Sequence, residues 1–466
     1  MHVEVISTED LGDRSYLVHD GTSAVVVDPQ RDVDRVEKVL ADLGVRCAMV
    51  VETHIHNDYV TGGYDLAMRS GCPYVVNAAD EVSFARLAVR DGDELTVGAM
   101  TIRVMATPGH TDTHLSYVIS EGGGTPAVFT GGSLLYGSVG RTDLVDVDRT
   151  EELTRAQYHS ARRLAAELPD ATPVYPTHGF GSFCSSGSAA GGDGGTIGQE
   201  KGRNDALVTE DEDAFVDTLI ANLSAYPAYY AHMGGLNRGG PTAPDLSPPA
   251  VLEAEQLRHR IDAGEWVVDL RDRTAYAASH VHGSVGIALG QQFSTYVGWL
   301  MPWGTPLTLI GESAEQVAEA QRMLVRIGID ELQGSATGSA EQLSAGTAPS
   351  SYPRHTFAEL PGVLVDAGSA TGDDAVLLDV RRDDEYATDH IPGAAHVPMH
   401  ELLDKLDTLP PGQLWVHCAS GYRASIAASL LDRAGRDVVF IDDAFDSAVA
   451  SGLTTKSRDI PRTSST

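Results

Sequence analysis

The sequence predicts an α/β protein with several domains. The chain has 466 residues, 42% of them hydrophobic, which suffices for about two to four domains with buried cores. Apolar β-rich runs at residues 47–51, 101–106 and 172–176 each give way to a polar loop. Two later segments each contain an apolar strand and a second strand that runs into a helix, which is typical of α/β units.

Charge and cysteine content argue against several classes of protein. The formal net charge of −33 would repel nucleic acid and anionic membranes, so we expect neither as a partner. Four cysteines are too few for a disulfide framework in a chain of this size. The first residues, MHVEVISTEDLGD, lack the basic start and apolar core of a signal peptide, and no later stretch approaches about 18 uncharged apolar residues. We therefore expect a cytoplasmic protein with reduced thiols.

Composition shifts predict the domain boundaries. Pro and Gly cluster at residues 234–249, and residues 333–353 are small, polar and flexible in character. We expect four parts: 1–245, 250–335, 354–456 and a flexible tail at 457–466. The second and third parts form a weak internal repeat. Each has a strand ending in Asp (WVVDLRD, AVLLDVRRDDEY), a histidine-containing turn and a helix that ends at Gly.

Candidate metal ligands follow the strands of the first domain. The loops THIHND, TPGHTDTH and THG each come directly after an apolar run, and strands that end in such loops gather their ligands along one edge of a sheet. Residues two apart, as in HIH, suit a loop, because on a helix they would point about 200° apart. Imidazole and carboxylate groups are common metal ligands. The candidates are His54, His56, Asp58, His110 and His178, whereas we expect His114 and Asp112 to be structural.

Four motifs carry a resemblance to a known family. THIHNDYVTGG, TPGHTDTHLSY, FTGGSLLYGSVGRTDL and YPTHG, in this order and at these separations, resemble the metallo-β-lactamase superfamily, and within it the persulfide dioxygenases fused to rhodanese domains. The resemblance extends over nearly all of the chain. It implies an αββα sandwich with metal at one sheet edge for the N-terminal domain, followed by two rhodanese-like α/β domains.

The chain departs from this family at two ligand positions. Tyr59 stands where the dinuclear zinc hydrolases of the superfamily have a histidine, which disfavours two metals. In the persulfide dioxygenases one Fe(II) is held by two histidines, which match His54 and His110, and by the aspartate of an FTGD motif, where this chain has Gly132. Two histidines and a carboxylate leave three faces of the iron free for O₂ and substrate.

Gly132 leaves the expected ligand set open. One Fe(II) per chain could be held with the help of His56, Asp58 or His178, or an exogenous anion could complete the site. The site could also bind metal weakly, and zinc is the alternative metal. Asp143 lies eleven residues beyond position 132 and is a weaker substitute.

Three further residues are candidates for the substrate site: Tyr59, Arg141 and Cys184. The Gly/Ser-rich run GFGSFCSSGSAAGGDGGTIG after His178 is longer than a plain connection needs, and we expect it to be a mobile wall of that site. Cys184 lies within this run and is either a reactive thiol or a bystander.

The third domain carries a thiol of its own. LWVHCASGYRASIAASLLDRAG reads as a strand, a loop from Cys418 to Arg423, and a helix. A thiol at a helix N-terminus beside a cation gains thiolate character, and backbone N–H groups of the loop can bind an anion. The segment resembles a rhodanese, in which CxxxxR is the active loop, so we expect Cys418 and Arg423 to be catalytic. The expected sulfane-sulfur-binding loop is Ala419, Ser420, Gly421 and Tyr422.

The second domain lacks this thiol. Counting back from the shared helix-ending glycines places Gly311 opposite Cys418, and the chain has no cysteine between residues 184 and 418. We therefore expect this domain to serve in packing or docking between the other two.

The resemblance implies an enzyme of sulfur metabolism. A low-molecular-weight thiol persulfide, such as glutathione persulfide, would be oxidised with O₂ to sulfite at a mononuclear non-haem iron. Cys418 would deliver or remove sulfane sulfur, with joining to sulfite as thiosulfate as one outcome. Two alternatives stay open: a zinc-dependent hydrolase of thioester type, and a rhodanese sulfurtransferase whose metal domain is not catalytic. We also expect a homo-oligomer.

Overall fold

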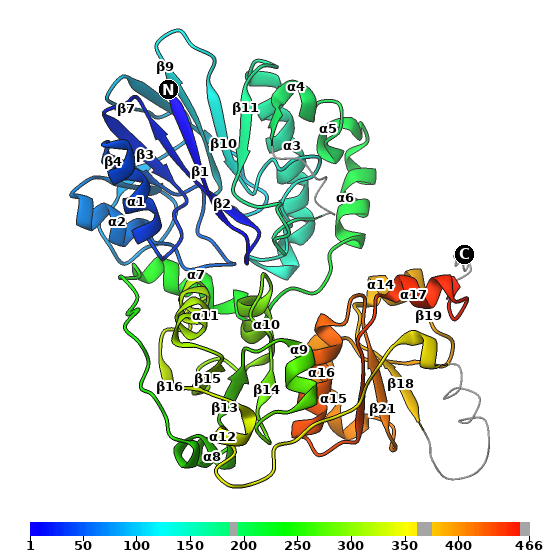
Figure 1. Ribbon diagram of the computed structural model, residues 1–466. Coiled ribbons are helices and arrows are strands. Elements are labelled where there is room, and N and C mark those ends of the chain that lie inside the picture. The colour runs from blue at the N-terminus through cyan, green and yellow to red at the C-terminus, as the bar shows by residue number, and fades with distance from the viewer. Residues whose placement is uncertain (187–193, 361–374, 457–466) are drawn as a thin grey trace. The chain divides into compact units, whose positions relative to one another are not determined.

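The computed structural model describes residues 1–186, 194–360 and 375–456. The chain forms two compact units (Figure 1). Unit 1 consists of Met1–Asp245 together with Arg322–Asp330, and unit 2 consists of Leu246–Gln321 together with the residues from Glu331 onward. The tail that we expected at 457–466 lies outside the described residues.

Unit 1 is built on two six-stranded sheets (Figure 1). The first, in the order β1-β2-β3-β4-β5-β6, contains β1 (His2–Thr8), β2 (Asp13–His19), β3 (Ser23–Val27), β4 (Arg46–Val51), β5 (Tyr74–Asn77) and β6 (Leu87–Val89). The second, in the order β12-β11-β10-β9-β8-β7, contains β7 (Glu94–Val97), β8 (Met100–Ala106), β9 (Leu115–Glu121), β10 (Ala127–Gly131), β11 (Pro173–Pro176) and β12 (Gly195–Thr196).

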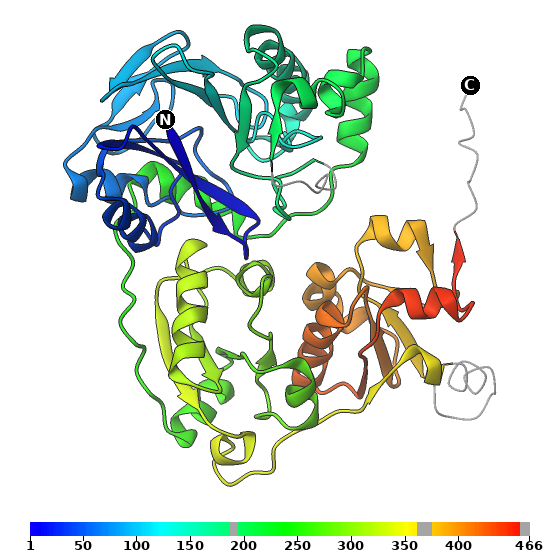
Figure 2. The ribbon, with the colours of Figure 1, turned by 45° about the horizontal axis from the view of Figure 1, so that its top comes forward.

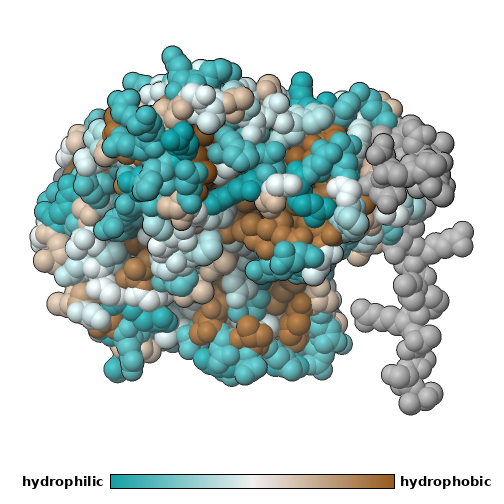
Figure 3. All heavy atoms as spheres, turned by 90° about the horizontal axis from the view of Figure 1, so that it is seen from below, coloured by the Kyte–Doolittle hydropathy of each residue, from teal (hydrophilic) through white to brown (hydrophobic). Residues whose placement is uncertain are grey.

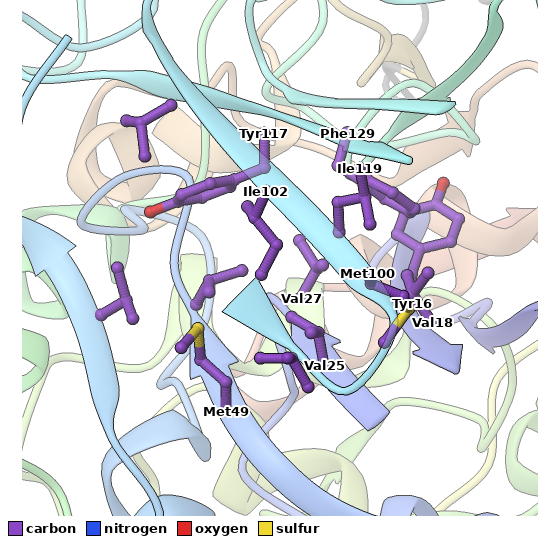
Figure 4. Packing of buried hydrophobic residues seen from close by; sticks show 14 of the residues in the cluster. Tyr16, Val18, Val25, Val27, Met49, Met100, Ile102, Tyr117, Ile119 and Phe129 are labelled. Carbon is purple, nitrogen blue, oxygen red and sulfur yellow. The ribbon is translucent and has the colours of Figure 1, made fainter. Parts of the chain in front are cut away.

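Apolar side chains fill the space between these two sheets (Figure 4). Val25 and Val27 of the first sheet and Ile102 and Phe129 of the second are completely buried in this cluster. Alternate residues of a strand point to opposite faces, so each sheet can present one apolar face to its partner and another to covering helices.

Helices cover the outer face of each sheet. On the first sheet, α1 (Asp34–Leu43) and α2 (Gly63–Ser70) add buried side chains to a second apolar cluster. On the second sheet, α3 (Thr150–Glu167) and α6 (Glu212–Ala221) add theirs to a third. Unit 1 is therefore an αββα sandwich. Its other helices are η1 (Val147–Arg149), α4 (Ile197–Glu200), α5 (Asp205–Val208) and α7 (Tyr230–Gly239).

The strand directions explain why the candidate loops meet. β8 and β10 both pair antiparallel with β9, and β11 pairs parallel with β10, so β8, β10 and β11 all end at the same edge of their sheet. In the first sheet β3 and β4 are parallel and also end together.

Unit 2 contains two all-parallel sheets (Figures 1 and 2). The first, in the order β14-β13-β15-β16, contains β13 (Trp266–Asp269), β14 (Val285–Gly286), β15 (Leu307–Gly311) and β16 (Leu332–Thr337). The second, in the order β17-β22-β21-β18-β20, contains β17 (Arg354–His355), β18 (Val376–Asp379), β20 (Ala395–His396), β21 (Leu414–His417) and β22 (Val438–Ile441). A separate pair joins β19 (Asp389–His390) to β23 (Thr455–Lys456).

The helices of unit 2 follow the same two halves. The first half has α8 (Ala254–Asp262), α9 (Arg273–Ala278), α10 (Phe293–Leu300), α11 (Ala314–Arg326) and α12 (Ala340–Leu343), and the residues of α11 from Arg322 belong to unit 1. The second half has η2 (Phe357–Glu359), α14 (Asp383–Thr388), η3 (Met399–Glu401), α15 (Leu402–Lys405), η4 (Leu406–Thr408), α16 (Tyr422–Arg433) and α17 (Phe445–Ala450).

The two halves of unit 2 repeat one arrangement. In the first, Asp269 is paired with Ile310, and in the second Asp379 is paired with His417, so Gly311 and Cys418 follow equivalent residues. Both aspartates also accept two-pronged hydrogen bonds from the arginine two residues later. The half without a cysteine thus keeps the framework of the half that has one.

The structure differs from the sequence prediction at residues 333–353. Instead of a flexible linker, this segment contains most of β16 and all of α12. Position 334 is a glycine because the backbone packs tightly against a neighbour. A β-carbon at that position would come 2.6 Å from Cγ of Leu252. Small residues at this point reflect close packing and not flexibility.

Hydrophilic residues alternate with smaller hydrophobic groups on the face shown in Figure 3. Within the described part of the chain, no helix has the length and apolar character needed to cross a membrane.

Candidate functional site

Four histidines of unit 1 lie next to one another at strand ends. His54 and His56 follow β4, His110 follows β8, and His178 follows β11. The ring centroid of His54 lies 4.1 Å from that of His56, 4.8 Å from that of His110 and 5.3 Å from that of His178. All four side chains are buried. The structure thus brings together the three loops that the sequence singled out.

Protein groups hold one ring nitrogen of His110 and one of His178. Nδ1 of His110 lies 2.7 Å from the carbonyl oxygen of Arg141, and since a carbonyl only accepts, Nδ1 carries the proton. Nδ1 of His178 lies 2.8 Å from Oδ1 of Asp13. Such contacts are usual behind metal-binding histidines, because they orient the ring and leave Nε2 for the metal.

His54 is fixed by a hydrogen-bond chain that ends on Asp28. Oγ1 of Thr53 donates its only proton to Oδ2 of Asp28 at 2.7 Å, so Nδ1 of His54, 2.9 Å from the same hydroxyl, must donate to it. Asp28 also accepts from Oγ1 of Thr177 at 2.5 Å. Burial raises the pKa of Asp28, but His56 and these hydrogen bonds lower it to about 2. Asp28 has a φ of 49°, a strained conformation that its neighbours must hold.

The Nε2 atoms of His54 and His178 lie 3.3 Å apart, within hydrogen-bond distance of each other. Two imidazoles on one tetrahedral metal, each with a metal–nitrogen distance of about 2.0–2.1 Å, have their nitrogens about 3.3 Å apart. The separation in this chain therefore allows both nitrogens to bind one metal ion.

Tyr59 orients His56. The Tyr59 hydroxyl donates to the carbonyl oxygen of Asp28 at 3.3 Å and lies 3.0 Å from Nε2 of His56. Nε2 of His56 is also 3.2 Å from Glu52 and 3.4 Å from the Asp28 carboxylate. Burial lowers the pKa of His56, but the two carboxylates raise it to about 9. Tyr59 is completely buried in these contacts, and its role at the substrate site stays a prediction.

Buried polar atoms without a hydrogen-bond partner surround the histidines. Within the described part of the chain they include Nδ1 of His56, Nε2 of His110, Oδ1 of Asp58 and Oδ2 of Asp13. An unpaired buried polar atom costs about 1–3 kcal/mol and is rare in native proteins. A cation would satisfy these atoms together. The residues present therefore fit a metal ion, and they offer His54, His56 and His178 as one buried group of ligand atoms within 4.8 Å of one another.

Asp13 on β2 is a site residue that sequence reasoning missed. His178 lies between two carboxylates, 2.8 Å from Asp13 and 3.1 Å from Asp58. Burial lowers the pKa of His178, but the two carboxylates raise it well above its usual value. Burial and the neighbouring Asp58 raise the pKa of Asp13 to about 8. No local pattern marks Asp13, because the contact joins residues 165 positions apart.

Gly132 does not leave an open ligand position. A β-carbon at this residue would lie 2.2 Å from Cδ2 of His110, so the imidazole ring occupies the space that an aspartate would need. The backbone N–H of Gly132 donates to Nε2 of His114 at 3.0 Å, and Nδ1 of His114 lies 3.0 Å from Oγ1 of Thr107. With both nitrogens engaged, His114 is structural.

Arg141 and Asp143 hold each other. The guanidinium of Arg141 makes two 2.7 Å hydrogen bonds to the Asp143 carboxylate and one of 2.8 Å to the carbonyl oxygen of Ser224. Both charged groups are thus engaged with each other, and substrate binding by Arg141 and metal binding by Asp143 stay predictions. Residues 187–193 of the Gly/Ser-rich run, expected to be a mobile wall, lie outside the described residues.

A cavity of about 170 Å³ opens beside the histidine loops. Ile55 and Asn57, which alternate with the candidate ligands, line it together with Thr111, the residue after His110. Helix α7 contributes Tyr230 and Arg238 to the lining. A small molecule in this cavity would lie against the two loops that contain His54, His56 and His110.

The second candidate site is the Cys418 loop of unit 2. The backbone N–H of Gly421 donates to Sγ of Cys418 at 3.2 Å, directly before α16 begins. Gly421 has a φ of 86°, which glycine adopts without strain. The guanidinium of Arg423 makes a two-pronged ion pair with Glu385, at 2.5 and 2.7 Å. The loop thus has the form of an amide cradle for a sulfur anion.

The other half of unit 2 covers this loop. The Tyr422 hydroxyl donates to the carbonyl oxygen of Ala288 at 3.0 Å, and the Tyr296 ring lies 5.8 Å from the Tyr422 ring. Arg273 donates to Asp442 at 2.8 Å. These contacts leave Cys418 only 1% exposed.

Comparison with known proteins finds similarity in the regions that contain both sites. The family model of the metallo-beta-lactamase superfamily matches residues 10–178, and that of the rhodanese-like domain matches residues 365–450. A probable polyketide biosynthesis zinc-dependent hydrolase, BaeB, of Bacillus velezensis is 30% identical over 175 residues, which cover 36% of this chain and 72% of that protein. This chain belongs to the metallo-β-lactamase superfamily.

Other members of the superfamily with differing activities are also similar. The mitochondrial persulfide dioxygenase ETHE1 of Homo sapiens is 28% identical over 240 residues, 51% of this chain and 82% of that protein. A hydroxyacylglutathione hydrolase of Cupriavidus metallidurans is 36% identical over 174 residues, 35% of this chain and 62% of that protein. A crystal structure of a metallo-beta-lactamase from Staphylococcus aureus has a TM-score of 0.65 at 27% identity and covers 72% of this chain and 99% of that one.

These findings confirm part of the domain prediction. The family models identify a rhodanese-like domain at the Cys418 half of unit 2, and a rhodanese-like character of the other half stays a prediction. The superfamily domain resembles both persulfide dioxygenases and hydroxyacylglutathione hydrolases, and its buried His/Asp groups are typical of the metal sites of this fold.

Proposed function

We propose that the protein processes sulfane sulfur, oxidising a low-molecular-weight thiol persulfide in unit 1 and carrying sulfane sulfur on Cys418 in unit 2. The observation that carries this proposal is the cradle of Cys418, whose sulfur accepts a hydrogen bond from the Gly421 N–H at 3.2 Å. A thiol held in this way at a helix N-terminus is suited to bear a persulfide anion. Sulfane sulfur is then the group that the chain transfers, and a persulfide is the natural substrate of the site in unit 1.

Sulfur transfer at Cys418 needs no external oxidant. The Cys418 thiolate attacks the outer sulfur of R–S–SH, the old S–S bond breaks as the new one forms, and R–S⁻ leaves with the bonding electron pair. Attack of sulfite on Cys418–S–SH releases thiosulfate and a proton and regenerates the thiolate. The Gly421 N–H stabilises the anion at each stage.

In unit 1, His54, His110 and His178 would hold the metal, with His56 beside them. When bound, Fe(II) supplies O₂ activation, and the net reaction is R–S–SH + O₂ + H₂O → R–SH + sulfite + 2H⁺. Asp13 and Asp58 keep a proton on Nδ1 of His178, which fixes Nε2 toward the centre.

A zinc-dependent hydrolase of thioester type is the second candidate. The 3.3 Å separation of the His54 and His178 nitrogens suits a tetrahedral ion, and Gly132 supplies no carboxylate for the iron site of a persulfide dioxygenase. The similarity to hydroxyacylglutathione hydrolases favours the same reading.

The test is elemental analysis of anaerobically purified protein, paired with O₂ uptake on glutathione persulfide. About one iron per chain with persulfide-dependent O₂ uptake, lost in His110→Ala, supports the dioxygenase. Stoichiometric zinc with thioester hydrolysis and no O₂ uptake replaces it by the hydrolase. Metal-free protein that takes up no O₂ even with added Fe(II), yet transfers sulfur from thiosulfate to cyanide, leaves only the chemistry of Cys418.

A further inference from the structure

We infer that Cys184 is a ligand of the metal in unit 1 and takes the place in the ligand set that Gly132 cannot fill. The inference rests on a metal centre in unit 1, as the proposed function does, but not on which reaction occurs there. Sγ of Cys184 and ring nitrogens of His110 and His178 all lie within 4.8 Å of one another, and all three residues are completely buried.

The separation is compatible with direct ligation. Zinc–sulfur and zinc–nitrogen distances of about 2.3 and 2.0–2.1 Å place sulfur and nitrogen ligands of one tetrahedral ion about 3.6 Å apart. Small side-chain adjustments bring a group of this size onto a single ion. The Cys184 side chain thus approaches the metal position from the loop after β11, whereas a side chain at position 132 would approach it from the end of β10.

An independent observation points to a cation beside this thiol. Nε2 of His110 is buried and has no hydrogen-bond partner among the described residues, and the same holds for Oδ1 of Asp58. The hydrogen-bond contact of the Cys184 sulfur is weak, since the Tyr230 hydroxyl lies 3.9 Å away. A thiol is a poor donor, so this contact does not account for a cysteine at this place.

Arg141 fixes the two ligands relative to each other. Its backbone N–H donates to the carbonyl oxygen of Cys184 at 2.8 Å, while its own carbonyl oxygen accepts from Nδ1 of His110 at 2.7 Å. Its guanidinium donates to the carbonyl oxygen of Phe183 at 3.2 Å. One positioning residue therefore sets both the imidazole and the loop that carries the thiol.

This inference gives the metal imidazole ligands and one thiolate ligand. Position 132 contributes no carboxylate. Thiolate and imidazole together suit zinc and also iron and cobalt, whereas magnesium and calcium prefer oxygen. The bound ion therefore belongs to the softer metals, and one of its faces is closed to substrate by Cys184.

The test uses the full chain loaded with Co(II), because a thiolate bound to Co(II) gives a near-ultraviolet charge-transfer band. We expect this band in the native protein, its loss in Cys184→Ser, and metal affinity in that variant lowered more than about tenfold. Cys72→Ser, at a thiol remote from the histidines, should keep both band and affinity. Retention of the band and affinity in Cys184→Ser overturns the inference.

A second readout needs no variant. X-ray absorption at the metal edge reports the ligand atoms, and we expect one sulfur at about 2.3 Å in addition to nitrogen ligands. A set of nitrogen and oxygen ligands without sulfur overturns ligation by Cys184 even while O₂ uptake on persulfide still supports the proposed function. Native protein that binds neither Co(II) nor Fe(II) overturns both.

Discussion

The imidazole ring of His110 fills the space that a side chain at position 132 would need. The nearest ring atom, Cδ2, lies 2.2 Å from where a β-carbon on Gly132 would be. Gly132 and His110 therefore form one packed unit, and neither can change alone. The site is therefore packed around a residue without a side chain at position 132, and a single substitution there cannot restore a carboxylate ligand.

Restoring the aspartate of the FTGD motif should harm the site. Gly132→Ala and Gly132→Asp both force His110 to move, and overpacking of this kind costs about 1–3 kcal/mol. We expect lower stability in urea unfolding and weaker metal binding for both variants. Gly123→Ala is the matched control, because a β-carbon there meets nothing within 4 Å. Tighter metal binding by Gly132→Asp with unchanged stability would contradict this account.

The buried pair Asp379–Arg381 should make unit 2 sensitive to acid. Burial raises the pKa of Asp379, but Arg381 and His417 bring it below its usual value. A carboxyl with a lowered folded-state pKa stabilises the protein fully above its unfolded pKa of about 4, and this contribution is lost as the pH falls through the folded value. Asp379→Asn should therefore lower the unfolding free energy by about 3 kcal/mol near neutral pH and by progressively less as the pH falls below about 4.

Asp269→Asn is the control for this pair, because Asp269 and Arg271 make the same contacts in the half without a cysteine. It should also destabilise unit 2 but leave sulfur transfer by the folded protein unchanged. An Asp379→Asn penalty of the same size at neutral and at acid pH would show that the ionised pair is not its cause.

Access to Cys418 should depend on the Tyr422 hydroxyl. Tyr422→Phe removes the hydrogen bond to the carbonyl oxygen of Ala288, worth about 1 kcal/mol, and loosens the cover over a thiol that is 1% exposed. We expect alkylation of Cys418 by a bulky maleimide to become severalfold faster. Tyr386→Phe removes a hydroxyl that bonds within its own half, to Ala394, and should have no effect. Equal rates in the two variants would mean that the cover opens elsewhere.

Glu385 should tune the charge at the sulfur-transfer loop. Its ion pair with Arg423 neutralises a cation that follows the Cys418 loop. Glu385→Gln should lower KM for the thiosulfate dianion about fivefold, corresponding to about 1 kcal/mol, with the effect fading at high salt. Steady-state kinetics at two ionic strengths measure it. A higher KM together with a lower kcat would instead mean that Glu385 orients Arg423.

The sequence indicates which loops carry the site but not how their atoms are held. His54, His110 and His178 are visible because each follows an apolar strand, and parallel strand ends meet at one edge. The contacts behind them are not visible. Asp13 reaches His178 across 165 positions, and Arg141 acts on His110 through its backbone carbonyl, which any residue could supply.

Composition misled where packing selects small residues. Residues 333–353 have the make-up of a linker, yet Gly334 is required by the contact with Leu252. Conversely, the repeat within unit 2 was visible because its strands and their terminal aspartates recur in the same order.

The hydrogen bonds of Asp28 also set when the site can form during synthesis. The Asp28 carboxylate joins Thr53, 25 residues away, to Thr177, 149 residues away. His178 lies 124 residues after His54, so at about 5–20 residues per second a ribosome needs roughly 6 to 25 s to reach it. Throughout this interval the nascent chain displays His54 and His56 without His178 to complete the group. Metal that arrives in this period meets only a partial site, so selective loading has to wait until the sandwich has closed.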